Sequence, residues 1–172
     1  MSFLDVLAQY AQKSPESASG TSEAHFNEIA PQLPRDTLSN GMAQTFNSDQ
    51  TPPFGDMVGK LFGQSSPQQR AGLLTQLLQS LGPTAMAALG SGVLGRVFGS
   101  NPSPQSGPAS PITPEQANQV SPDDVREIAA RAEQHQPSVV NGVSDFFAQH
   151  PDLIKGIGAM GLAVLLGKMA RR

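Results

Sequence analysis

The stretch Ser66-Pro-Gln-Gln-Arg-Ala-Gly-Leu-Leu-Thr-Gln-Leu-Leu-Gln-Ser-Leu81 decides the fold class of this chain. Its leucines recur at alternating spacings of one and three residues, which is the repeat of an amphipathic α-helix and not of a β-strand. These leucines are Leu73, Leu74, Leu77, Leu78 and Leu81, here called the Leu stripe. Gly82-Pro83 stops the pattern. We therefore expect a helix over 67–81 with one strongly apolar face.

The starts of several predicted helices share a signature, a Ser or Thr followed by Pro. The hydroxyl accepts a hydrogen bond from a free N–H of the first turn, and Pro has no N–H to leave unpaired there. The signature occurs at Thr51, Ser66, Thr113 and Ser121. Gln69 and Gln116 complete capping boxes, and Asp124 suits the positive end of its helix.

The expected helices follow from these starts and from the apolar spacing. They cover 2–13, 22–30, 35–46, 52–62, 67–81, 114–119, 122–135, 137–149 and the run from 151 towards the C-terminus. Residues 83–98 form either a further helix or, over 90–99, a flexible Gly-rich lead into the linker. Residues 14–21 are interpreted as a polar connection between two helices. Gly63 is interpreted as the residue that ends the helix 52–62. No segment alternates long enough to favour a sheet, so the chain is predicted to be all-α.

A linker is expected at 99–111, which contains four prolines and no large apolar residue. Such a segment cannot bury itself. The linker would separate an N-terminal multi-helix region, 1–98, from a C-terminal three-helix region, 112–172. Within the second region, 112–152 holds seven acidic and two basic residues, whereas 153–172 holds four basic residues and no acidic one.

Composition argues against several function classes. A net charge of −3 offers no general attraction to nucleic acid, and the absence of cysteine excludes disulfides and thiol chemistry. The motifs of serine hydrolases and phosphate-binding loops are missing. His25 and Glu28 could face one metal ion, but a complete ligand set is not apparent. His150 is expected to act as a cap or to face solvent. We expect no catalytic site, no cofactor and no metal, in a cytoplasmic protein.

The C-terminal helix carries a second candidate surface. Gly156, Ala159, Ala163 and Gly167 form a strip of small residues, where another helix can approach closely. The uncharged run from 156 to 167 spans only about 18 Å as a helix, against about 30 Å of hydrocarbon. A core helix is therefore favoured over a membrane span, although flanking lysines could lengthen the span or contact anionic lipid.

Three short motifs resemble small bacterial helical proteins of unassigned function. They are Ile112-Thr-Pro-Glu-Gln, Ser121-Pro-Asp-Asp-Val-Arg-Glu-Ile-Ala and Phe147-Ala-Gln-His-Pro. The Gly/Leu-rich segment 89–98 is similar to the YidB-like group among these proteins. The resemblance covers about half of the chain and implies a compact array of short helices. It brings no active site with it.

Together these features predict a non-enzymatic helical interaction or scaffolding protein. It would bind a protein partner or a second copy of itself through the Leu stripe and the small-residue strip. The alternative is a peripheral membrane protein anchored by 153–172. An enzyme remains only if a cluster such as His25 and Glu28 binds metal.

Overall fold

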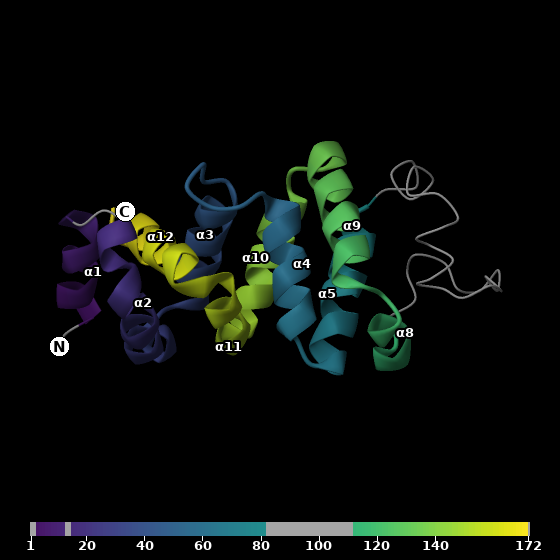
Figure 1. The fold of residues 1–172 in the computed structure, drawn as a ribbon, viewed down its shortest axis with the longest axis horizontal. Coiled ribbons are helices and arrows are strands. Elements are labelled where there is room, and N and C mark those ends of the chain that lie inside the picture. Colours follow the sequence, from purple (N-terminus) through teal and green to yellow (C-terminus); the bar gives the residue numbers. More distant parts are fainter. Residues whose placement is uncertain (1–2, 13–14, 82–111, 172) are drawn as a thin grey trace. The chain divides into compact units, whose positions relative to one another are not determined.

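The computed structural model describes residues 3–12, 15–81 and 112–171, and these ranges are helical with no strand among them (Figure 1). The first range and most of the second form α1 (Phe3–Gln12), α2 (Pro15–Ile29), the 3-10 turn η1 (Ala30–Gln32), α3 (Arg35–Phe46), α4 (Phe54–Gln64) and α5 (Pro67–Ser80). The third range forms α8 (Pro114–Asn118), α9 (Pro122–His135), α10 (Val139–Gln149), α11 (Pro151–Ile154), the 3-10 turn η2 (Lys155–Ile157) and α12 (Gly158–Ala170). The all-α prediction is confirmed. Residues 83–98 and the expected linker lie outside the described residues.

Three of the predicted helix starts are confirmed as capping boxes. The backbone N–H of Gln69 donates to Ser66 Oγ, and the N–H of Ser66 donates to Gln69 Oε1. Thr113 with Gln116 and Ser121 with Asp124 repeat the arrangement at α8 and α9. Each box satisfies two N–H groups that the helix itself cannot pair.

The helix start predicted at Thr51 is wrong, because α4 begins at Phe54. The residue before a proline is disfavoured in helical conformation, so Pro52 before Pro53 delays the helix. The Thr51 hydroxyl instead donates to the carbonyl oxygens of Thr45 and Ser48, at 2.6 and 2.9 Å. It closes the turn that follows α3.

The polar connection predicted at 14–21 is also wrong over its described residues, since α2 begins at Pro15 and continues to Ile29. Few apolar residues mark this helix, which is why periodicity did not find it. Its packing comes from α12, against which it lies closely. The buried Ser22 donates its hydroxyl hydrogen bond to the carbonyl oxygen of Ala159 at 2.7 Å. Tertiary contact here outweighs weak local preference.

The chain forms two compact units. Their boundaries differ from those of the two regions, 1–98 and 112–172, that were predicted from the linker. Unit 1 comprises 1–53 and 144–172, and unit 2 comprises 54–143, so the boundary falls within α10. The physical reason is long-range helix pairing: α12 packs on α1, α2 and α3, while α9 packs on α4. The predicted division at 99–111 considered only chain composition, which carries no information on such pairs.

The core of unit 1 gathers around α12. Figure 1 shows α12 lying beside α1, α2 and α3. The side chains enclosed there are large and almost fully buried, and they include Tyr10, Phe26, Ile29, Met42, Leu162, Leu165 and Leu166. The ring of Phe46 also meets that of Phe147 at 6.2 Å between centroids. An apolar helix with partners on three sides is the expected centre of such a bundle.

Candidate interaction surfaces

The Leu stripe lies inside unit 2 and is not a docking surface. All five leucines are buried: Leu73, Leu74, Leu77, Leu78 and Leu81. The helix that carries four of them, α5, packs against α4, α8 and α9. The prediction that this stripe is a working surface is therefore corrected. Periodicity identified the apolar face, but those three helices already cover it.

The small-residue strip is divided by a break in its helix. Gly156 belongs to the turn η2, whereas Ala159, Ala163 and Gly167 belong to α12. Between them Gly158 has φ 84° and ψ 168°, a backbone region open essentially to glycine alone. The continuous helix expected from residue 151 onwards is therefore wrong. The four residues do not form one strip.

The described part of the strip packs within unit 1. Ala163 is buried, and Ala159 accepts the hydrogen bond from Ser22 through its carbonyl. A Cβ added at Gly167 would lie 3.7 Å from the carbonyl oxygen of Tyr10 in α1, which is ordinary contact. Ala163 and Gly167 therefore lie against the chain's own helices, but the contact at Gly167 is not close enough to require glycine, and the Ala159 side chain is exposed.

A tighter glycine contact lies in α4, and sequence reasoning missed it. Gly55, Gly59 and Gly63 recur every four residues and so share one face of the helix. Gly63 lies inside α4, which corrects the expectation that it ends the helix. A Cβ added at Gly55 would lie 2.7 Å from the Arg126 carbonyl oxygen, and one added at Gly59 would lie 2.7 Å from that of Pro122. The four-residue spacing was the available signal.

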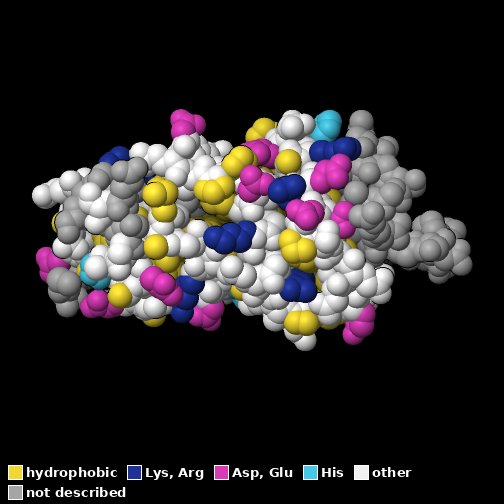
Figure 2. Space-filling model, viewed as in Figure 1, with side chains coloured by type: hydrophobic (Ala, Val, Ile, Leu, Met, Phe, Trp, Pro, Cys, Tyr) yellow, Lys and Arg dark blue, Asp and Glu magenta, His cyan; other side chains and the backbone are white. Residues whose placement is uncertain are grey.

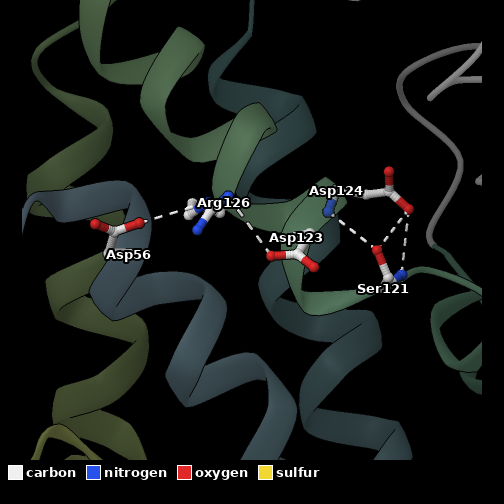
Figure 3. A network of polar contacts seen from close by, with 5 residues as sticks. All are labelled: Asp56, Ser121, Asp123, Asp124 and Arg126. Atoms are coloured by element: carbon white, nitrogen blue, oxygen red, sulfur yellow. Dashed lines mark hydrogen bonds and ion pairs between the residues drawn. The ribbon is translucent and has the colours of Figure 1, made fainter.

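Polar groups border this α4–α9 contact (Figure 3). Arg126 of α9 pairs with Asp56 of α4 at 3.5 Å and with Asp123 of its own helix at 3.6 Å. All three side chains are largely exposed, so these pairs contribute at most about 1 kcal/mol each. At the start of α9, Asp124 accepts the hydrogen bond of the Ser121 hydroxyl at 2.8 Å. The cluster orients α9 and offers no reactive group.

The histidines considered as candidate ligands have structural surroundings. His25 Nδ1 lies 3.1 Å from the Tyr10 hydroxyl, and the two rings meet edge to face. Burial raises the pKa of Tyr10, against a smaller lowering effect of its hydrogen bond with Thr21. His150 makes no side-chain cap, which corrects one reading of it, and its ring packs on Phe146 at 4.9 Å. Among the residues that the structure describes, no group of three or more His, Asp or Glu could hold a metal ion.

In the described ranges, the two large apolar side chains that are exposed both belong to unit 1. Leu4 of α1 is 68% exposed and Met160 of α12 is 48% exposed, and no other large apolar side chain described there is as open. The helices that carry them pack on each other. On the face that Figure 2 presents, acidic, basic and apolar side chains are otherwise interspersed. These two residues are the remaining candidates for a contact surface.

One described segment, Pro151–Ala170, is long and apolar enough to cross a bilayer by length and composition alone. In the structure 56% of its most apolar window is buried. A buried core helix passes the same test, so burial against α1, α2 and α3 accounts for the composition.

Comparison with known proteins gives no match: no family model fits the chain, and none of the curated proteins or solved structures resembles it.

Proposed function

We propose that this chain is a non-enzymatic helical interaction protein that binds a protein partner through the outer side of unit 1. The observation that carries the proposal is the exposure of Leu4 and Met160 on two helices that pack together. Burying exposed apolar surface is the main favourable contribution to most protein association. The resemblance to YidB-like bacterial proteins, which implies a compact helical protein without an assigned active site, belongs to the same proposal.

The solvent side of α1 supports this surface. After Leu4, the exposed positions Ala8 and Ala11 follow four and seven residues on, so they continue one apolar line along the helix. Val6, Leu7 and Tyr10 face the core. Helix α1 therefore carries apolar residues on its outer face as well as on its inner one. Its other exposed residues, Asp5, Gln9 and Gln12, are polar and flank this apolar line.

The test is a binding assay with matched variants. We expect Leu4→Glu to weaken capture of the native partner from cell extract at least tenfold, and Met160→Glu to do the same. Gln9→Glu places the same charge on the exposed side of α1 and should bind normally. Circular dichroism checks that all three variants are folded. Equal binding by wild type, Leu4→Glu and Met160→Glu contradicts the proposal.

A second candidate is a peripheral membrane protein anchored by 153–172. It is favoured by the apolar length of Pro151–Ala170 and by the exposed Met160. Co-sedimentation of the intact protein with anionic vesicles tests it. If the intact protein stays in the supernatant, this candidate is excluded.

A further inference from the structure

We draw no further inference here: the strongest candidate, the exposed apolar line of Leu4, Ala8 and Ala11 on α1, belongs to the surface already proposed, and nothing in the described residues shows what covers it.

Discussion

A side chain at Gly59 would place its Cβ 2.7 Å from the backbone carbonyl oxygen of Pro122. Backbone cannot yield as a flexible side chain can, so this contact requires glycine at position 59. Helix α9 thus lies against bare backbone in α4. The pairing of these two helices depends on residues with no side chain to contribute.

Replacement of Gly59 by Ala is expected to destabilise the protein by about 1–3 kcal/mol, because overpacking outweighs the gain in helix propensity. Gly63→Ala is the control, since its nearest neighbour, Pro122 Cγ, lies at 3.4 Å. We expect this control to be neutral or stabilising by up to about 1 kcal/mol. Urea denaturation measures both, and equal effects would show that close approach at Gly59 has no energetic role.

Gly41→Ala should cost less than Gly59→Ala, although its clash distance is the same. The atoms that a Cβ would meet are Met169 Cγ and Leu165 Cδ1, both in side chains that can rotate. We expect a loss of about 1 kcal/mol or less. Gly20→Ala, in open space on α2, should instead gain up to about 1 kcal/mol. A larger loss at Gly41 than at Gly59 would contradict this ranking.

Arg70 should not be replaceable by lysine. Its guanidinium donates to the carbonyl oxygens of Phe62 and Gly63 at 3.0 and 2.9 Å and lies over the Phe62 ring. These carbonyls belong to the last turn of α4, where a planar, positively charged donor is favoured. We expect Arg70→Lys and Arg70→Met to lose a similar amount, about 1–2 kcal/mol in thermal or urea unfolding.

Arg131→Lys is the control for that substitution. Arg131 forms a partly exposed ion pair with Glu127 on its own helix, and lysine can replace it there. Its stability should change by less than about 0.5 kcal/mol. If Arg70→Lys is equally mild, the forked contact at the end of α4 does not contribute as described.

The buried Tyr10 should make the folded protein less stable at alkaline pH. Burial raises its pKa above the ordinary value of 10.0, so the folded protein holds the phenolic proton more tightly than the unfolded chain. Stability from this group is therefore complete below pH 10 and declines as pH rises towards the folded pKa. As the chain has one Tyr and no Trp, ultraviolet titration reports on Tyr10 alone. Tyr10→Phe should remove the decline, and a titration midpoint at or below 10 would contradict the burial effect.

The sequence predicted local structure well and long-range packing poorly. Ser66, Thr113 and Ser121 marked their helix starts because a capping box is complete within four residues. The Leu stripe was recognised as an apolar face, yet no sequence pattern states whether a face is covered by the same chain or by another. Gly158 escaped notice for a related reason: Gly156 and Gly158 weaken a helix locally, but the apolar spacing continues across them, so the break was not predicted.

The candidate site shows the same limit. The spacing of apolar residues on α1 suits either side of the helix, so it could not single out Leu4 as exposed. Its exposure follows from the arrangement of α1 on α12, which depends on residues near both ends of the sequence. Met160 likewise is one apolar residue within a segment predicted to be one helix, and its spacing gives no sign of exposure.

The distribution of unit 1 over both ends of the sequence has a consequence for biosynthesis. Helices α1, α2 and α3 leave the ribosome first, but their main partner, α12, emerges only after all of unit 2 has been made. Unit 2 can therefore fold during translation, while α1–α3 wait with uncovered apolar faces. During that interval chaperones can bind the exposed apolar faces of these helices. If synthesis stops before Gly158, the released chain lacks α12 and cannot complete the core of unit 1.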